Sequence, residues 1–391
     1  MNLLTELTTL QPAMQAWRRH LHQFPELAYQ EQHTADFIAE QLHSFGLTVD
    51  RGLATTGVVG TLTAGNSANS IALRADMDAL AITEQNTFAH ASKHGGVMHA
   101  CGHDGHSAML LGAACYLAEH KDFNGTVYFI FQPAEEGRAG AQQMIAEGLF
   151  NKFPADKVFG LHNFPGFSAG HFAVKTGAMM AAFDCFEIEL SGNATHAAMP
   201  HLGHDVIVAS AQLITSLQTV VSRYLNPIAP AVLSITQIHA GHTWNALPDK
   251  AVLRGTLRCF DQTIQIELIK RLQELVAAVA SMFELSATVR INPENPGYPV
   301  TVNDEAATAL AIKAATAVVG SASIHQDIQP SMGSEDFAFM LQEKPGCYLW
   351  LGNDQPGHSS CLHNPTYDFN DDILVVGAAY WVQLVREALT A

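Results

Sequence analysis

The densest group of chemically active side chains lies between His99 and His106, in the sequence HACGHDGH. Cys101 and His103 stand two positions apart, just ahead of an expected helix, so that both side chains project from one turn toward one point. Thiolate and imidazole are good ligands for zinc and similar borderline metals. The same spacing leaves two alternatives open, a buried cysteine beside a helix-capping Asp104 and a thiol nucleophile with a histidine base.

Two adjacent carboxylates, Glu135 and Glu136, follow the apolar run TVYFIF at residues 126–131. A continuous apolar run is typical of a strand buried on both faces, and open α/β sheets bind ligands at the carboxyl ends of such strands. Their mutual repulsion is costly in apolar surroundings unless a cation is present or one of them is protonated. A metal enzyme needs this division, in which one carboxylate coordinates and its neighbour holds a proton; a solvated loop with two charges is the alternative.

Further ligand-type side chains share this position beyond the end of a predicted strand. They are Asp76 and Asp78 after residues 71–74, His162 after 158–161, and His363 beyond 347–351. Residues 334–336 open a helix and fit a cap with acidic residues in the first turn. Each group alone is more readily structural, but their recurrence at separate strand ends is hard to reach by chance. Because one metal needs three or four ligands, the number of candidates predicts a two-metal site.

The elements that carry these side chains alternate between strand and helix, which predicts an α/β fold with a mostly parallel central sheet. We expect strands at 58–62, 71–74, 126–131, 158–161 and 347–351, and helices at 1–23, 32–45, 107–120, 140–150, 304–319, 336–342 and from 372 onward.

The pattern changes near residue 183, where FDCFEIEL alternates with period two, as a strand with one solvated face does. Strands at 183–190, 232–238, 252–260 and 287–291 and helices at 206–224 and 264–283 suit a four-stranded antiparallel sheet with two helices on one face. The segment NPENPG at 292–297 is the strongest break in the chain. We therefore predict an α+β domain of residues 183–294 inserted into a larger domain of 1–182 and 295–391.

Polar groups of the insert stand in turns between strands: His196 in SGNATHAAMP and Asn245 in HTWNALP. Arg254 and Arg258 share one face of a strand. An inward arginine there suits a substrate carboxylate through a bidentate contact, and surface charge is the alternative.

The charge and composition exclude several classes of function. Twenty Lys and Arg against 37 Asp and Glu give a net charge of −17, which repels phosphate backbones and anionic lipid, so we expect no nucleic-acid and no membrane partner. Six scattered cysteines do not make a disulfide framework, and the longest apolar run, 373–382, is too short for a membrane span. With no basic stretch ahead of an apolar one at the N-terminus, these features predict a cytoplasmic protein.

In their order along the chain, these residues resemble the M20 metallopeptidases, specifically the amidohydrolase branch of N-acyl-amino-acid amidohydrolases, hippurate hydrolases and plant auxin-conjugate hydrolases. The motifs that carry the resemblance are RRHLHQFPE (18–26), LRADMDAL (73–80), HACGHD (99–104), FQPAEEG (131–137), GLH (160–162), THAAMP (195–200), NALPD (245–249), GSEDF (333–337) and LH (362–363). The resemblance implies a zinc-peptidase-like catalytic domain with a lid domain that dimerises. Ala81 and the pair Ala246-Leu247 depart from the family pattern without touching a ligand position.

Carried over residue by residue, the resemblance implies these roles: metal ligands at Cys101, His103, Glu136, His162 and His363, the general base at Glu135, an acidic residue behind the ligands at Asp78, and substrate contacts at His196 and Asn245. Between the two arginines we favour Arg258 for the substrate carboxylate.

The expected reaction is hydrolysis of the amide of an N-acyl amino acid, with two divalent ions (Zn, Mn, Co or Ni) that activate water and polarise the carbonyl. Glu135 takes a proton from that water and returns it to the leaving amine. The expected partners are a small N-acyl amino acid or dipeptide and a second copy of the chain. A broad-specificity dipeptidase or aminoacylase, a cysteine-nucleophile amidase and a non-catalytic metal-binding scaffold are the alternatives. The intact Glu135 argues against the scaffold.

Overall fold

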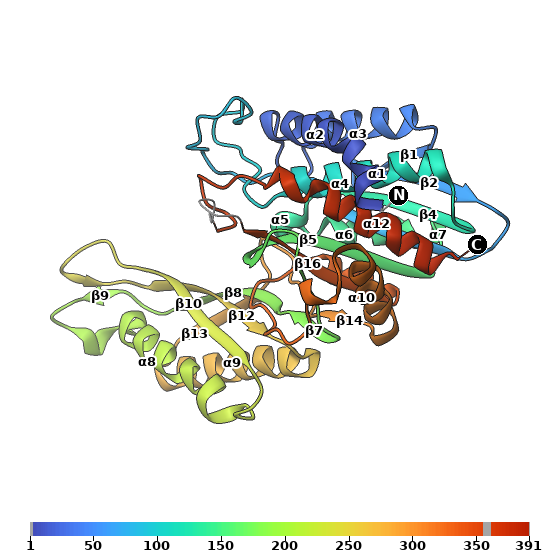
Figure 1. Cartoon of the computed structure of the whole chain (residues 1–391). Coiled ribbons are helices and arrows are strands. Elements are labelled where there is room, and N and C mark those ends of the chain that lie inside the picture. The colour runs from blue at the N-terminus through green and yellow to red at the C-terminus, as the bar shows by residue number, and fades with distance from the viewer. Residues whose placement is uncertain (1–2, 355–360, 391) are drawn as a thin grey trace. The chain divides into compact units, whose positions relative to one another are not determined.

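The computed structural model describes residues 3–354 and 361–390, and these form two compact units (Figure 1). The larger unit is Met1–Met179, Thr301–Gln329 and Asp336–Ala391, and the smaller unit is Met180–Val300 with Pro330–Glu335. The insertion expected at 183–294 thus compares with a smaller unit of 180–300 that also takes up residues 330–335. Backbone pairing explains this last piece, because the Ala181 N–H donates to the carbonyls of Ser331 (3.0 Å) and Gly333 (2.9 Å).

An eight-stranded mixed sheet forms the centre of the larger unit. In spatial order its strands are β1 (Thr48–Leu53), β2 (Gly57–Ala64), β4 (Gly125–Gln132), β3 (Ser70–Asp76), β5 (Lys157–Ser168), β16 (Gly346–Asp354), β6 (Phe172–Ala173) and β15 (Ile324–His325). The four central strands β4, β3, β5 and β16 run parallel, whereas β1, β2 and β4 pair antiparallel at one side and β6 pairs antiparallel with β16 at the other. The predicted parallel core is confirmed, with antiparallel strands added at its flanks.

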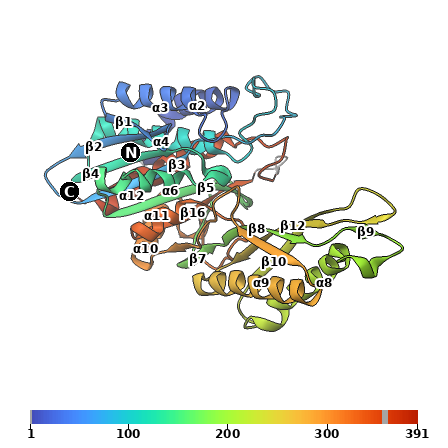
Figure 2. The same ribbon diagram turned by 180° about the vertical axis from the view of Figure 1, so that it is seen from behind.

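Helices cover both faces of this sheet, as Figure 1 and the reverse view in Figure 2 show. Their bounds are α1 (Leu3–Leu7), α2 (Gln11–Gln23), α3 (Gln32–Ser44), α4 (His103–His120), α5 (Glu135–Arg138), α6 (Gly140–Ala146), α7 (Leu149–Lys152), α10 (Glu305–Val319), α11 (Phe337–Glu343) and α12 (Leu374–Ala388). Helix α4 packs against α2, α12 and β3, while α6 and α11 pack against each other and against β4 and β5 respectively. A short strand β14 (Thr301–Asn303) pairs with β7 (Gly177–Met180).

The apolar sequences of the central strands explain why these strands are buried on both faces. Val127, Phe129 and Phe131 of β4 are fully buried in one core cluster with helices α4 and α12, and Tyr128 and Ile130 point to the other face. The parallel register places Asp76 beside Gln132 and Trp350 beside His162. The carboxyl ends of β3, β4, β5 and β16 therefore lie along one edge of the sheet, which is where the ligand-type residues occur in the sequence.

The smaller unit contains a four-stranded antiparallel sheet in the order β10 (Ala231–Ala240), β12 (Lys250–Cys259), β8 (Ala182–Ser191) and β13 (Ser286–Ile291). Helices α8 (Val206–Thr219) and α9 (Gln262–Met282) pack on it and on each other, and short strands β9 (Thr195–His196) and β11 (Ala246–Leu247) form a separate ribbon. The predicted α+β architecture is confirmed. By length and composition alone, Val206–Tyr224 is apolar enough to cross a membrane, with a mean hydropathy of 1.2 and 33% of its most apolar window buried.

Candidate metal centre

All five predicted metal ligands come together at the carboxyl edge of the large sheet. Cys101 Sγ lies 3.4 Å from His162 Nε2, and Glu136 Oε1 lies 3.3 Å from His363 Nε2 and 4.0 Å from His103 Nε2. Ligand atoms of Cys101, Glu136 and His363 all lie within 4.8 Å of one another. Segments as distant as residues 101 and 363 thus supply a single cluster of sulfur, nitrogen and oxygen donors.

The Nδ1 atoms of His103 and His162 have partners outside this cluster, so that the Nε2 atom of each ring faces it. The Nδ1 of His103 is 3.3 Å from a carboxylate oxygen of Asp78, and the Nδ1 of His162 donates to the Asn163 carbonyl at 2.6 Å. A second partner that fixes the ring in this way is characteristic of histidine ligands. Within the described residues, His103 Nε2 is buried without a hydrogen-bond partner, and the buried Glu136 Oε1 has the ionic contact with His363 Nε2. The orphaned nitrogen and the mixed donor set fit divalent metal ions.

The carboxylates around Cys101 and His103 give this cluster an excess of negative charge that favours a bound cation. Burial and the nearby Glu136 and Glu135 carboxylates raise the pKa of the Cys101 thiol well above its usual value. Burial works against a charged His103, yet Asp76, Asp78 and Glu136 raise its pKa to about 10. Carboxylates contribute to both pKa shifts, and a bound cation would balance their negative charge.

His106 lies beside the ligands but is already occupied by the protein. Its Nδ1 contacts Asp76 at 2.6 Å, and its Nε2 lies 2.7 Å from the Asn163 side chain, with its ring 4.4 Å from that of His162. Asp76 is also held by Arg74 at 2.7 Å. His106 and Asp76 therefore support His162 and His103 instead of forming a further site. The sequence reasoning missed His106, although its place in HACGHDGH, on the first turn of a helix, was available as a signal.

The loop that carries Glu135 and Glu136 has an irregular backbone. Ala134, Gly137 and Ala139 all have left-handed conformations, with φ of 56°, 72° and 51°. For a non-glycine residue this conformation costs on the order of 1 kcal/mol. The Glu136 N–H donates to Asp78 Oδ2 at 3.0 Å, and ligand atoms of His103, Glu135 and Glu136 lie within 4.8 Å of one another. The loop thus brings the predicted base beside two predicted ligands.

Residues 334–336 do not cap a helix as expected. Asp336 stands at the N-cap position of α11 without a side-chain capping bond. Its fully buried carboxylate accepts hydrogen bonds from Arg74 (3.1 Å), Gln132 (2.8 Å) and the Ala141 N–H (2.9 Å). The Asp336 carboxylate binds Arg74 instead of capping the helix, because a guanidinium buried in the sheet needs carboxylate partners. An arginine within the apolar strand IALRAD was the available signal.

The proposed cap of helix α4 is also wrong. The helix begins at His103, and its N-cap position is taken by Gly102 with φ of 97°. Asp104 points instead into the core, where His22 Nδ1 contacts it at 2.8 Å and Arg18 lies at 3.7 Å. Met14, Arg18 and His22 share the buried face of α2. Charged residues in helical register on an apolar face were the signal that this histidine is more than a surface group.

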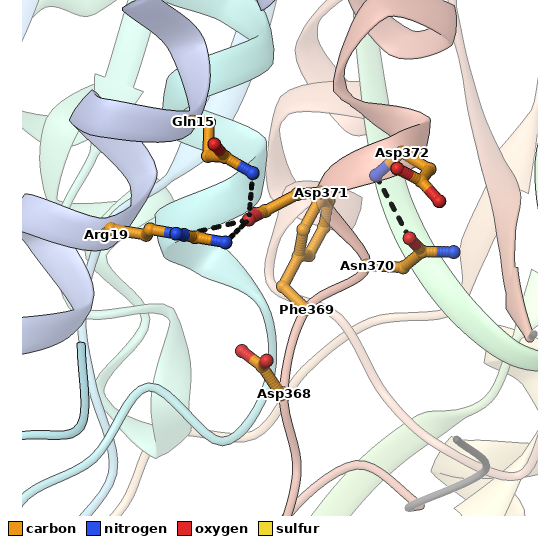
Figure 3. A pocket seen from close by; sticks show the side chains of 7 residues that line it. All are labelled: Gln15, Arg19, Asp368, Phe369, Asn370, Asp371 and Asp372. Atoms are coloured by element: carbon orange, nitrogen blue, oxygen red, sulfur yellow. Dashed lines mark hydrogen bonds and ion pairs between the residues drawn. The ribbon is translucent and has the colours of Figure 1, made fainter. Parts of the chain in front are cut away.

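This buried charge network reaches the surface at Asp371. Arg18 Nε donates to Asp371 Oδ1 at 2.7 Å, and Gln15 and Arg19 each contact Asp371 Oδ2 at 2.9 Å (Figure 3). A surface pocket of about 220 Å³ lies there, lined by Gln15, Arg19 and residues 368–372. The C-terminal segment thereby fixes α2, whose His22 and Arg18 in turn hold Asp104, the residue next to the predicted ligand His103.

The His22 contacts predict a pH dependence of stability. Burial lowers the pKa of His22, but Asp104 and Glu84 overcome this and raise it from 6.5 to about 9. The stabilisation, on the order of 3 kcal/mol, is therefore complete below about pH 6.5 and is lost as the pH rises through about 9. We expect His22→Gln to remove this part of the pH dependence in denaturant unfolding measured from pH 6 to 9.5. His43→Gln, on an exposed helix end, is the control. Parallel curves for wild type and His22→Gln would contradict the assignment.

The smaller unit brings His196 and Asn245 together. His196 belongs to β9 and is paired with Ala246 of β11, and Asn245 directly precedes β11, where its carbonyl accepts the Ala197 N–H at 2.9 Å. Both side chains are exposed. The Ala198 N–H donates to His196 Nδ1 at 3.0 Å, so the neutral ring carries its proton on Nε2 and presents a donor outward.

The two arginines of β12 differ in their partners. Arg254 is paired with Glu187 at 2.7 Å and lies 3.9 Å from Glu294. Arg258 donates one hydrogen bond to the Met332 carbonyl at 2.6 Å and stacks over Phe183, and within the described residues it makes no ion pair. Burial alone lowers the pKa of Arg258. Of the two arginines, Arg258 is thus the one without a carboxylate partner in the part of the chain that the structure describes.

Comparison with known proteins places this arrangement in a family. The model of peptidase family M20/M25/M40 matches residues 72–387. The chain is 40% identical to hippurate hydrolase of Campylobacter jejuni over the full length of both proteins, and 40% identical to N-acetyl-L-cysteine deacetylase of Bacillus subtilis over 96% of this chain and 88% of that one. A crystal structure from Bacillus subtilis, described as a dinuclear metal binding peptidase from the M20 family, superposes with a TM-score of 0.84 at 33% identity, covering 98% and 99% of the chains. The resemblance inferred from the motifs is confirmed, and the chain is an enzyme that belongs to peptidase family M20/M25/M40.

Proposed function

We propose that this protein hydrolyses the amide bond of N-acyl amino acids. The observation that carries the proposal is the placement of Glu135 beside Glu136 and His103 within a cluster of five sulfur, nitrogen and oxygen donors. The relatives named hippurate hydrolase and N-acetyl-L-cysteine deacetylase support this substrate class over the whole chain length.

Two divalent ions would be held by Cys101, His103, Glu136, His162 and His363. When bound, they supply Lewis acidity that activates water and polarises the scissile carbonyl. Five protein donors exceed what one tetrahedral ion uses, which supports two ions, and Glu136 Oε1 lies within 4.0 Å of ligand nitrogens from both His103 and His363.

Glu135 acts as the general base in this proposal. Its carboxylate is 8% exposed and belongs to the same group of facing ligand atoms as Glu136, although the five donors above do not require it. It takes a proton from the attacking water and returns it to the leaving amine nitrogen, so that the amine departs neutral.

We assign substrate contacts to three residues of the smaller unit. The outward Nε2–H of His196 is suited to donate to the developing oxyanion, and Asn245, on the same ribbon, offers an amide to the substrate. Arg258 is assigned to the substrate carboxylate, because its guanidinium is partly desolvated and makes no ion pair among the described residues.

We also propose a cytoplasmic homodimer formed through the smaller unit. Strand β10 is an edge strand whose residues 236–240 are exposed, and Ile207 and Val208 of α8 are 44% and 52% exposed. An unpaired edge beside an apolar helix face favours pairing with a second copy. All six cysteines are free, as a reducing compartment requires. Sedimentation equilibrium is expected to give the dimer mass, and a monomer would contradict the assembly.

The cysteine-nucleophile alternative is disfavoured by the surroundings of Cys101. A reactive thiol needs a lowered pKa, whereas burial and two carboxylates raise the pKa of this one.

A substrate panel tests the proposed function directly. Chelated enzyme reloaded with Zn, Mn, Co or Ni is assayed on benzoyl-, acetyl- and long-acyl amino acids, on the matching C-terminal amides, and on dipeptides. We expect metal-restored turnover of the acyl amino acids and at least about a tenfold loss of kcat/KM on the amides, since these remove the carboxylate. Arg258→Ala should abolish that discrimination while Arg254→Ala retains it. Turnover of dipeptides alone would favour the dipeptidase, and turnover without metal would overturn the proposal.

A further inference from the structure

We propose that Glu31, which lies outside the ligand cluster and 103 positions before Ala134 in the sequence, positions the general base Glu135 by holding the backbone of Ala134. The inference rests on the proposed function of Glu135.

The contacts of Glu31 are specific and fully enclosed. Its side chain is 0% exposed, at the residue that precedes helix α3. One carboxylate oxygen, Oε1, accepts the N–H of Ala134 at 2.9 Å, and the other, Oε2, accepts the hydroxyl of Thr56 at 2.7 Å. Both oxygens are therefore engaged by the protein, and Glu31 has a role distinct from that of a metal ligand.

Ala134, the residue that Glu31 holds, has an unfavourable backbone conformation. Ala134 adopts a left-handed conformation immediately before Glu135, and an alanine does not adopt it readily without support. The φ and ψ angles of Ala134 set the direction in which the Glu135 side chain leaves the strand end. Without the carboxylate, the buried Ala134 N–H loses this acceptor. An unsatisfied buried donor is costly, and this cost favours a different conformation of the loop.

The rest of the loop is fixed by similar contacts, which leaves Ala134 as the point that Glu31 controls. The Glu136 N–H donates to Asp78, the Ala141 N–H donates to Asp336, and the Tyr29 hydroxyl donates to the Arg138 carbonyl at 3.1 Å. Tyr29 and Glu31 thus hold the two ends of the short α5 turn from one segment.

A carboxylate at this position is costly to the protein. Burial, followed by repulsion from Asp78, raises the pKa of Glu31 to about 7, so the charged form is disfavoured relative to an exposed glutamate. We therefore assign Glu31 a hydrogen-bonding role, which a glutamine could also fill with the direction of the Thr56 bond reversed. Its carbonyl accepts from Ala134, and its amide N–H donates to the Thr56 hydroxyl.

The test compares Glu31→Ala with Glu31→Gln, and uses Glu40→Ala, exposed on the same helix, as the matched control. We expect Glu31→Ala to lower kcat by about 10- to 100-fold, with KM changed less than about twofold and with full metal content, since misplacement of a catalytic group affects the chemical step. Glu31→Gln should retain kcat within about threefold of wild type, because its carbonyl keeps the bond from the Ala134 N–H and its amide N–H makes a bond of reversed direction to the Thr56 hydroxyl. A Glu31→Gln loss as large as that of Glu31→Ala would overturn positioning through these bonds.

Amide hydrogen exchange of the peptide covering residues 133–140 gives a readout that does not depend on activity. Exchange is expected to accelerate in Glu31→Ala and to remain at the wild-type rate in Glu31→Gln and Glu40→Ala. If Glu31→Ala does not fold, Glu31→Asp keeps the charge but cannot reach both partners, and it should show the same acceleration with reduced kcat. Unchanged exchange and kcat in the folded Ala or Asp variant would overturn the inference. If the wild type hydrolyses none of the panel substrates while the exchange pattern holds, the proposed function fails and the loop assignment stands.

Discussion

Replacing Glu135 with glutamine is expected to lower kcat by about 10²- to 10⁴-fold, the range that a positioned general base contributes. Glutamine keeps the size of the side chain but cannot accept a proton from water at neutral pH. Because the five donors do not include Glu135, metal content measured by mass spectrometry should equal that of wild type. KM should change little, since the substrate contacts assigned to His196, Asn245 and Arg258 remain.

The control for this experiment is Glu119→Gln, an exposed carboxylate on α4. It should keep both turnover and metal. Wild-type kcat in Glu135→Gln would remove Glu135 from the base role, and a loss of metal in that variant would make it a ligand.

The second large effect is expected from Cys101→Ala. Removing the thiolate takes one of the five donors from a buried site, and we expect metal affinity to fall by more than about 100-fold, because even residues behind the ligands contribute 10- to 100-fold. Metal content after dialysis should fall from two ions toward one, and kcat should fall with it. Metal analysis and kcat measured on the same preparation test the link between the two.

Cys115→Ala, a half-buried thiol on α4, serves as the matched control and should bind metal and turn over as wild type does. Full metal content in Cys101→Ala would contradict the ligand assignment. Full metal content together with abolished turnover would instead revive the cysteine nucleophile.

The position of the site could be predicted from the sequence because it follows from strand topology. Continuous apolar runs identify buried strands, and parallel neighbours end at a common edge, so Asp78 after β3 and Glu136 after β4 were expected to lie close together, as the hydrogen bond between them shows. The fold class and the α+β insertion were accessible for the same reason, since local periodicity distinguishes a doubly covered sheet from a singly covered one.

The residues behind the site could not be predicted, because their partners are remote in sequence. Asp104 looks like a helix cap from its neighbours alone, and only the packing of α2 against α4 shows that His22 and Arg18 occupy its carboxylate. Glu31 likewise reads as a polar residue ahead of a helix until the contact with Ala134 is known. A capping role predicted from neighbouring residues is therefore wrong wherever a buried charge from another segment binds the same side chain.

The order of the strands in the large sheet has a consequence for biosynthesis. Strand β5 is flanked by β3 and β16, and β16 leaves the ribosome only after the 180–300 segment has been made. His363, and the residues Asp368 and Asp371 that bind Arg18, come later still. The nascent chain therefore carries a long apolar strand with one open edge for roughly half of its translation. The smaller unit, nearly continuous in sequence, can fold during that interval, before the segment that carries the predicted ligand His363 has been made.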